Sequence, residues 1–494
     1  MKQPSLMLPT EAPRQFQRPP LEVGPVRRAI GQIRHILDVG GPCEMTLVGE
    51  TQVSPRRKEP IYQLSTGETV VVTKRPDIDL PDDVDGVLRK LENGSFKWSS
   101  HRRVKAFEEL VTKEGWSTAA EKNSDNWSGE FSFRSEQSGA GQGDPEGLRP
   151  PQLGALHSIG AHWSLFHQPA TVVMPTGTGK TETMLSVLAS YQTGPLLVIV
   201  PSDALRTQTA RKFLTFGLLR KLKVLSPTAS NPIVGIITKR PRTKDDLDIF
   251  DSCNVIVATM SALGEGDALP LSTEIAKRVG ALMVDEAHHI GADGWARFRE
   301  AFLEKRVLQF TATPFRRDGK LVDGEVIYNY PLRMAQQDGY FKKIVFEPVY
   351  EIDPAEADRA IAETALTKLR ADIDKGLNHA LMARCANIDR ATAIHQIYMK
   401  IAPDLHPMLV HSGLTDTDER VERLRSGNSR IAVCVNMLGE GFNLPELKVA
   451  AVHDLHKSLA VLLQFVGRFT RSAAQRLILV MQLWSQTLRT QMYH

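Results

Sequence analysis

Short runs of almost uninterrupted apolar residues alternate with helical patterns from residue 148 onward. Strands that are apolar on both faces are typical of a parallel sheet covered by helices on each side. The runs form two series, which are separated by a helical stretch at 355–375. The first series is 171–174, 196–200, 255–259, 281–286 and 307–313, and the second is 379–385, 408–412, 430–435, 449–455 and 476–482. The sequence therefore predicts an α/β fold with two parallel-sheet domains in tandem.

The region before these runs differs in composition. Residues 1–137 open with an arm rich in proline and arginine, which is expected to be disordered, and continue as a small α+β domain of unknown role. In that domain, residues 61–64 and 69–73 flank a Ser-Thr-Gly turn and predict a hairpin. The segments 84–91 and 104–111 have the spacing of short amphipathic helices.

A Gly-rich segment, SGAGQGDPEG at 138–147, is predicted to be a linker. The two α/β domains are then expected at 148–335 and 340–494. Because only a short tail follows the last apolar run, the second domain is expected to be either compact or truncated.

The overall composition narrows the class of protein. The net charge of +4 permits nucleic-acid binding without arguing for it, since the location of the charge matters more than its sum. The four cysteines stand far apart with no C-x-x-C pair, so neither a structural zinc site nor a disulfide framework is expected. The chain has no apolar window of about 18 residues and no signal-peptide core, which predicts a cytoplasmic protein.

The stretch 174–184, MPTGTGKTETM, predicts a polyphosphate site between a strand and a helix. Glycines let backbone N–H groups approach phosphate oxygens, and the helix N-terminus adds positive potential. The loop residues expected around the phosphates of ATP are Thr176, Gly177, Thr178 and Gly179. Lys180 is expected to neutralise the β- and γ-phosphates, and the Thr181 hydroxyl to bind Mg²⁺. Met174 replaces the first glycine of the strict pattern, so a Gly-rich turn with an incidental lysine is the alternative.

A second apolar run, ALMVDEAHH, ends in two adjacent acids. Parallel sheets bind ligands at the carboxyl edge, where this run delivers Asp285 and Glu286. Asp285 is expected to hold Mg²⁺ through its water shell, and Glu286 to orient or deprotonate the attacking water. His288 and His289 could instead be metal ligands, but no third ligand lies at a suitable spacing.

The DEAH residues at 285–288 resemble those of superfamily 2 helicases and translocases of the DEAD/DEAH-box type. Further segments fit that family in order and with compatible spacing. They are 148–152, 198–209, 311–319, 410–413, 436–447 and 464–471. The stretch TATPFRRDG at 311–319 is similar to the restriction-enzyme and excision-repair branch. The resemblance covers about two-thirds of the chain.

The resemblance implies two RecA-like domains that face one ATP. Gln152 would read adenine, and Gly439 and Gly441 would line the nucleotide. The alternative for these two glycines is a purely structural role in a tight turn after a strand. Gln464, Arg468 and Arg471 are spaced to share one helix face. That face could be a solvated stripe, but the family pattern implies that both arginines reach the γ-phosphate as arginine fingers.

The same resemblance assigns the coupling and nucleic-acid contacts. His288 would be a polar bridge between the ATP site and the second domain, and Thr311 and Thr313 would link the ATP state to strand movement. Arg206 and Gln208 would touch the nucleic-acid backbone. The basic clusters 55–58 and 101–105 could extend that track or could be solvated faces.

These features predict an ATP-dependent helicase or translocase that uses ATP and Mg²⁺ and acts on nucleic acid. DNA is favoured over RNA because of the TATPFRRDG segment. One alternative is the motor subunit of a defence or restriction assembly, with a separate nuclease as partner. Another is an ATPase switch that binds nucleic acid without unwinding it.

Overall fold

The computed structural model describes residues 13–54, 57–76, 78–136, 146–263, 269–289, 298–312, 314, 321–340, 344–411, 414, 416–435, 446–454 and 477–482. The chain divides into two compact units. The first contains Met1–Leu148, Thr181–Val284 and Gly291–Val307, and the second contains Arg149–Lys180, Asp285–Ile290 and Leu308–His494. No described helix is both long and apolar enough to span a membrane.

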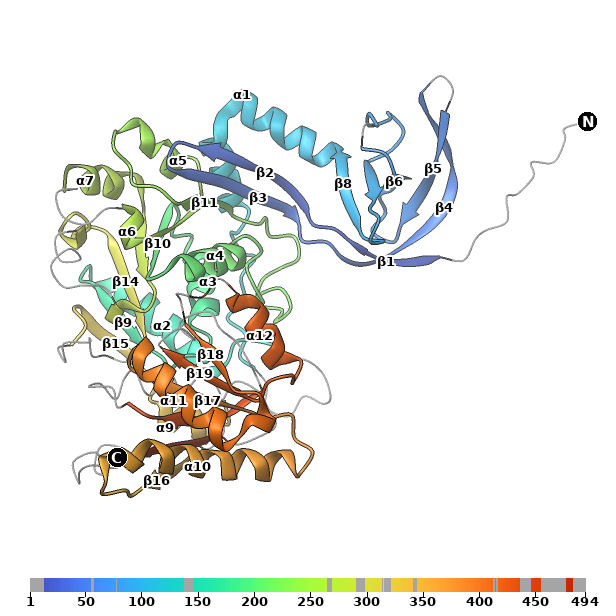
Figure 1. The fold of residues 1–494 in the computed structure, drawn as a ribbon. Helices are drawn as coiled ribbons and strands as arrows, with labels where there is room; N and C mark the ends of the chain where they lie inside the picture. Colours follow the sequence, from blue (N-terminus) through green and yellow to red (C-terminus); the bar gives the residue numbers. More distant parts are fainter. Residues whose placement is uncertain are drawn as a thin grey trace, which may run out of the picture. The chain divides into compact units, whose positions relative to one another are not determined.

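A six-stranded sheet dominates the N-terminal part of the first unit (Figure 1). Its strands, in spatial order, are β1 (Arg14–Arg18), β4 (Gly41–Ser54), β5 (Arg57–Leu64), β6 (Thr69–Thr73), β7 (Gly86–Lys90) and β8 (Phe96–His101). The predicted hairpin is confirmed, because β5 and β6 pair antiparallel around the Ser-Thr-Gly turn. The pairing of β6 with β7 is parallel, and the other pairings in this sheet are antiparallel.

The prediction of a helix at 84–91 is wrong, since this segment contains strand β7, which pairs with β6 and β8. Val87 packs in a cluster with Val71 and Val84, whereas Leu88 belongs to the cluster of Met45. In a strand that is buried on both faces, neighbouring residues are both apolar. Adjacent apolar residues also occur on the buried face of an amphipathic helix, which explains the wrong prediction.

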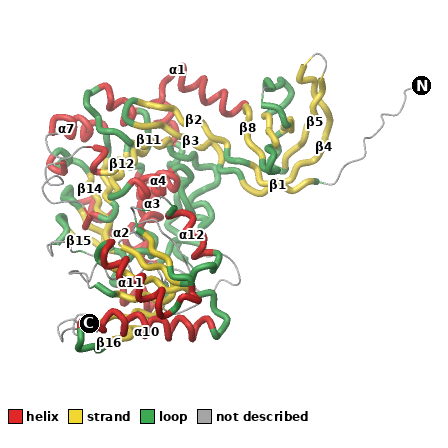
Figure 2. The backbone as a smooth tube through the Cα atoms, viewed as in Figure 1, coloured by secondary structure: helices red, strands yellow, loops and turns green. Residues whose placement is uncertain are grey.

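The helix expected at 104–111 is confirmed as part of α1 (Arg102–Asp125), which follows β8 directly (Figure 2). His101 caps it, because its ring nitrogen Nδ1 accepts a hydrogen bond from the backbone N–H of Arg103 at 3.1 Å. Gly115 has a φ of 86° and interrupts the helical backbone within α1. Such a left-handed conformation is easily adopted only by glycine.

The expectation of a disordered arm is wrong for the described residues after Ala12, which form β1, β2 (Leu21–Arg28) and β3 (Gly31–Asp38). Strands β2 and β3 pair antiparallel, and β3 continues the sheet of the first α/β domain through β11 (Ile233–Ile237). Leu21, Val23 and Ile33 are fully or almost fully buried. Burial of this apolar face therefore offsets the conformational entropy that the hairpin loses on folding, despite the nearby prolines.

The first α/β domain is built on parallel strands. Within the first unit these are β13 (Ala281–Val284), β10 (Leu196–Val200), β12 (Val255–Thr259) and β11, in that order, followed by β3 and β2. In the second unit, β15 (Glu325–Asn329), β9 (Ala170–Val173) and β14 (Arg306–Thr311, most of which belongs to this unit) lie side by side in that order, and both pairings are parallel. The five predicted apolar runs are confirmed as strands, whereas β11 and β15 were not predicted.

Helices alternate with these strands along the chain, as the sequence pattern predicts. The longer ones are α2 (Pro150–Leu165), α3 (Lys180–Tyr191), α4 (Asp203–Phe213), α7 (Leu269–Arg278) and α9 (Leu332–Gln337). The short ones are η1 (Asp245–Leu247), α5 (Asp248–Asp251), α6 (Met260–Leu263) and η2 (Ala287–His289).

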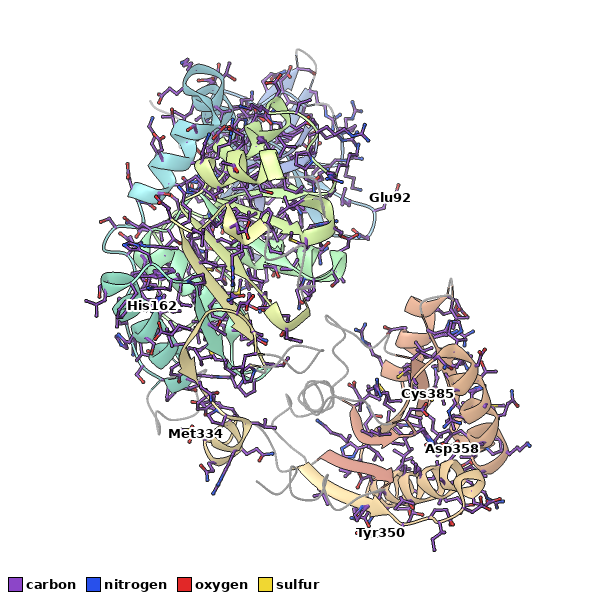
Figure 3. All side chains as sticks on the ribbon, turned by 90° about the vertical axis from the view of Figure 1, so that its left-hand side faces the viewer. Glu92, His162, Met334, Tyr350, Asp358 and Cys385 are labelled. Atoms are coloured by element: carbon purple, nitrogen blue, oxygen red, sulfur yellow. The ribbon has the colours of Figure 1, made fainter. Side chains whose placement is uncertain are left out.

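The second α/β domain has a six-stranded parallel sheet. Its spatial order is β16 (Ile344–Val349), β21 (Leu477–Gln482), β20 (Leu447–Val452), β17 (Ala380–Cys385), β19 (Ile431–Val435) and β18 (Met408–Val410). Its other elements are α10 (Pro354–Ile373), α11 (Ile388–Ile401), η3 (Pro403–Leu405) and α12 (Thr417–Arg425). Cys385 and Tyr398 belong to its buried core, and Figure 3 shows the side chains of this domain around Cys385 and Asp358. All five apolar runs predicted here are confirmed as strands.

Candidate active site

The glycine-containing loop between β9 and α3 is a tight turn whose geometry depends on two glycines. Gly177 and Gly179 have φ values of 93° and 99°, which side chains disfavour. Thr178 is buried, and its hydroxyl donates a hydrogen bond to the Pro175 carbonyl at 2.7 Å. Lys180 then begins α3, and Thr181 is its half-buried second residue. This is the strand–loop–helix arrangement that binds phosphate groups.

The Gln152 amide packs directly against this loop. Its Nε2 donates a 3.3 Å hydrogen bond to the Gly179 carbonyl, and its Oε1 accepts one from the backbone N–H of Arg149 at 2.8 Å. A Cβ atom on Gly179 would lie 1.9 Å from Nε2 of Gln152. The amide predicted to read adenine therefore also supports the backbone of the phosphate-binding loop.

Arg149 is a contact that our sequence reasoning missed. Its guanidinium donates a hydrogen bond to the Gly177 carbonyl at 3.1 Å and stacks 5.0 Å from the centre of the Tyr340 ring. Two prolines follow it at the start of α2, which makes Arg149 the N-cap residue. Arg149 lies within the segment 148–152, which was assigned to a family motif. The residues around it give no sign that its guanidinium contacts the loop.

The two acids at the end of β13 lie where the sequence predicts, beyond the carboxyl end of the strand. The strand stops at Val284, so Asp285 and Glu286 stand in the following turn, and both are buried. Glu286 has a φ of 50°, an uncommon value for a residue with a side chain. Its backbone N–H donates to Oδ1 of Asp285 at 3.0 Å. Strained backbone of this kind is common at functional sites.

An ion pair joins the phosphate-binding loop to the DEAH segment. Nζ of Lys180 lies 2.5 Å from Oε1 of Glu286, and the two side chains are only 7% and 11% exposed. A buried charge is stable only with a well-placed partner, so each side chain fixes the position of the other. The residues predicted for phosphate binding and for water activation are thus brought together.

His288 extends this group toward the end of β14. Its Nδ1 is hydrogen-bonded to Oγ1 of Thr311 at 2.9 Å and lies 3.6 Å from Oε2 of Glu286. All three side chains are buried. Lys180, Glu286, His288 and Thr311 therefore form a continuous polar chain across three segments of the sequence.

The donor set suits ATP and Mg²⁺. The loop offers backbone N–H groups and a lysine for phosphate, and the predicted metal ligands, the Thr181 hydroxyl and the Asp285 carboxylate, are oxygen donors of the kind that Mg²⁺ prefers.

Several predicted site residues lie outside the described part of the chain. They are Thr313, Gly439, Gly441, Gln464, Arg468 and Arg471.

The predicted nucleic-acid contacts differ in accessibility. Gln208 is exposed on α4. The Arg206 side chain is only 12% exposed, and its guanidinium lies 2.6 Å from Oδ1 of Asp203. In the cluster at 101–105, Arg102 donates to the Val84 carbonyl at 2.6 Å and Arg103 to the Leu37 carbonyl at 3.1 Å. Both arginines of this cluster thus hold the main chain of neighbouring elements.

Two family models match the two α/β domains. Residues 146–316 match the model described as "Type III restriction enzyme, res subunit", and residues 366–473 match the "Helicase conserved C-terminal domain".

Curated relatives are distant. The chain is 28% identical over 160 residues to the UvrABC system protein B of Mycobacterium leprae, covering 29% of this chain and 22% of that protein. It is 24% identical over 356 residues to the uncharacterized protein ML1624 of M. leprae, covering 61% and 56%. It is 20% identical over 371 residues to the DNA 3'-5' translocase XPB2 of Sulfurisphaera tokodaii, covering 63% and 76%. The chain spans about a fifth and about half of the length of the first two relatives.

A solved fragment assigned to the HsdR subunit of a type I restriction enzyme from Vibrio vulnificus YJ016 has the same fold. The match has a TM-score of 0.51 at 17% identity and covers 90% of this chain and 88% of that one. The fold and the two domain models agree with the order of motifs along the sequence. The chain is therefore similar to superfamily 2 helicases, and its first α/β domain matches the model of a restriction-enzyme subunit.

Proposed function

We propose that this chain is an ATP-dependent motor that acts on DNA, as a helicase or translocase. The observation that carries the proposal is the buried 2.5 Å ion pair between Lys180 and Glu286, at the junction of the glycine loop and the DEAH segment. It brings the cation needed for phosphate next to a carboxylate that can act on water.

ATP supplies the phosphoanhydride bond to be cleaved, and Mg²⁺ neutralises its phosphates. Residues 176–179 and Lys180 would hold the phosphates, and Thr181 and Asp285 would hold the metal ion. Glu286 orients and deprotonates the attacking water. Arg468 and Arg471 complete the site from the second α/β domain.

The comparisons favour DNA over RNA as the polymer. One matching model is that of a restriction-enzyme subunit, and one relative is named as a DNA translocase. The TATPFRRDG segment points the same way. Contacts of such a motor go mainly to phosphates, so binding should weaken steeply with salt.

The match to the restriction-subunit model supports a second candidate, the motor of a defence assembly in which a separate protein cuts. A motor of this kind translocates without separating strands. Triplex displacement without strand displacement would favour it over a helicase.

ATP hydrolysis by the full chain tests the main proposal. We expect single- or double-stranded DNA to stimulate hydrolysis and RNA to stimulate it less. Lys180→Ala should abolish hydrolysis, whereas Lys277→Ala, which removes an exposed lysine of α7, should leave it unchanged. Normal hydrolysis by Lys180→Ala would disprove the site, and a wild-type ATPase that no nucleic acid stimulates would disprove the motor.

A further inference from the structure

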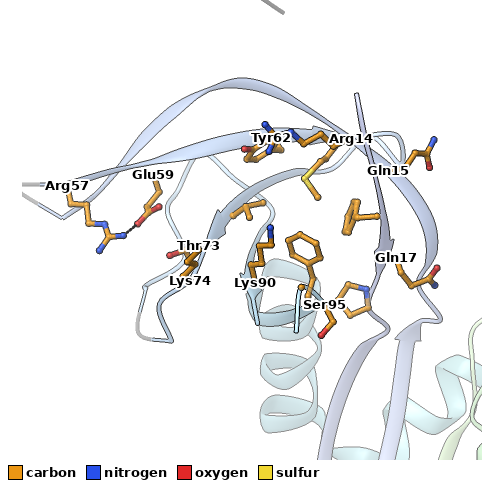
Figure 4. Close-up of a pocket in the computed structure, with 16 residues that line it drawn as sticks. Arg14, Gln15, Gln17, Arg57, Glu59, Tyr62, Thr73, Lys74, Lys90 and Ser95 are labelled. Atoms are coloured by element: carbon orange, nitrogen blue, oxygen red, sulfur yellow. Dashed lines mark ion pairs between the residues drawn. The ribbon is translucent and has the colours of Figure 1, made fainter. Parts of the chain in front are cut away.

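The N-terminal six-stranded sheet contains a pocket of about 760 Å³ that is separate from the candidate active site (Figure 4). It is lined by residues of β1, β4, β5, β6 and β7, of the turn before β8, and of the start of β8. Its volume lies within the range of pockets that take organic ligands. A single phosphate ion would fill only a small part of it.

The charge of the lining is positive. Four cations, Arg14, Arg57, Lys74 and Lys90, face one carboxylate, Glu59, which is paired with Arg57. Lys74 and Lys90 are exposed and form no ion pair with any residue that the structure describes. Figure 4 places Lys90 centrally, with the Arg57–Glu59 pair toward one end. The pocket is therefore suited to an anionic ligand.

Aromatic rings stand among these cations. Phe16, Tyr62 and Phe96 line the pocket and pack against the buried cluster of Met45 and Leu88. Phe16 and Phe96 meet edge to face with their centres 5.1 Å apart. Their outer surfaces remain partly exposed and their positions are fixed by packing, so they offer a rigid platform for a flat ring.

Cations beside fixed aromatic rings match the chemistry of unpaired nucleotides. Phosphates bind the cations and bases stack on the rings, as in other single-strand binding sites. A duplex keeps the faces of its bases stacked internally, and an acidic peptide would use the cations but not the rings. We propose that this pocket binds single-stranded nucleic acid, with Lys74 and Lys90 at the phosphates and Tyr62 and Phe96 against the bases. The site is independent of ATP and would hold a strand while the motor changes state.

Binding of fluorescein-labelled dT and rU oligomers of about ten nucleotides tests this. The full chain is titrated without nucleotide, and anisotropy is read at several salt concentrations. The Lys74→Ala/Lys90→Ala variant should bind at least about tenfold more weakly. The slope of log affinity against log salt should fall by about 1.4, for two lost phosphate contacts. The two oligomers distinguish a DNA strand from an RNA strand.

The chain offers matched controls. Lys97→Ala/Lys113→Ala removes the same charge from β8 and α1, at exposed positions outside the pocket and outside both basic clusters, and should bind like the wild type. Tyr62→Ala should lose about tenfold, corresponding to one stacked base, whereas Tyr62→Phe keeps the ring and should retain affinity. Thermal melting confirms that each variant is folded.

Four results would overturn the proposal. They are wild-type binding by the Lys74→Ala/Lys90→Ala variant, an equal loss in the Lys97→Ala/Lys113→Ala control, an equal loss of affinity for a duplex of the same length in the Lys74→Ala/Lys90→Ala variant, and equal affinity for poly-glutamate. Basal ATP hydrolysis of the pocket variants should remain at the wild-type level. A failure of this inference is thereby distinguished from a failure of the motor proposal.

Discussion

Nζ of Lys180 and Oε1 of Glu286 lie 2.5 Å apart in a buried ion pair, although the two residues are separated by more than 100 positions in the sequence. We assign the lysine to phosphate binding and the glutamate to water activation. A phosphate that binds Lys180 competes with Glu286 for the same ammonium group. In the proposed mechanism, binding of ATP and release of the carboxylate toward water are coupled through this hydrogen bond.

The first prediction concerns Glu286→Gln. The amide keeps an oxygen that can accept from Lys180 but cannot take a proton from water, so hydrolysis should fall by about 10²- to 10⁴-fold. ATP affinity should be equal or higher, because phosphate no longer competes with a carboxylate for Lys180. Single-turnover hydrolysis and binding of a fluorescent ATP analogue measure the two effects separately.

Glu304→Gln, which changes an exposed acid, is the control and should behave like the wild type. If Glu286→Gln hydrolyses ATP at the wild-type rate, Glu286 does not activate the water. If it loses ATP binding instead, the carboxylate supports the loop rather than the chemistry.

The second prediction concerns the 2.9 Å hydrogen bond between His288 and Thr311. Thr311→Val removes the hydroxyl while preserving shape, so basal hydrolysis should persist. Stimulation by DNA should fall by about tenfold, a typical coupling between two sites. Thr311→Ser restores a hydroxyl and should recover stimulation. Equal stimulation of wild type and Thr311→Val would remove this bond from the coupling.

Much of the fold was predictable because its signals are local. Every apolar run predicted as a strand overlaps a strand of the two parallel sheets. A strand buried on both faces must be apolar throughout, and this pattern is visible in the sequence alone. The positions of Lys180 and of Asp285 and Glu286 follow from it, because each lies just beyond a buried strand.

The features that sequence reasoning missed depend on distant partners. Strand β3 is stabilised by β11, about 200 residues later, and no local pattern specifies that pairing. Arg149 reaches Gly177 only because α2 and the phosphate-binding loop fold together. Strand β7 was mistaken for a helix because its burial on both faces comes from neighbours on either side. The roles of Arg468 and Arg471 stay predictions, since these residues lie outside the described part of the chain.

The third prediction concerns Gly31, where the N-terminal hairpin meets β11. A Cβ atom on this residue would lie 2.0 Å from the Ile236 carbonyl oxygen, so Gly31→Ala must move the backbone of one strand. We expect a loss of about 1–3 kcal/mol in stability. Hydrogen exchange of the β11 amides should quicken accordingly.

Gly49→Ala is the matched control, because a Cβ there has no atom within 4 Å. It lies in β4 of the other sheet and should leave exchange in β11 unchanged. Wild-type protection of β11 in Gly31→Ala would show that the hairpin does not stabilise this edge.

The fourth prediction concerns Asp358 on α10, labelled in Figure 3. Its carboxylate accepts hydrogen bonds from Arg390 at 2.8 and 2.9 Å and lies 3.1 Å from Nδ1 of His453. Burial alone would raise the pKa of Asp358, but the hydrogen bonds and charges of His453 and Arg390 outweigh it and lower the pKa to about 2. The charged form is therefore the stabilising one.

Asp358→Asn should destabilise α10 and β20 locally by about 1–2 kcal/mol at neutral pH, a value reduced for the partial exposure of Arg390. Hydrogen exchange of these elements measures the change. Because the folded-state pKa lies below the usual value of 3.8, the contribution is complete above about pH 5 and is lost as the pH falls toward 2. The difference in stability between wild type and variant should shrink over that pH window.

Asp404→Asn is the control, since Asp404 forms a similar pair with Arg370 at 2.8 Å, but both side chains are about half exposed. It should cost less than about 1 kcal/mol. Equal effects of the two substitutions would mean that the Asp358 network contributes no more than a surface ion pair.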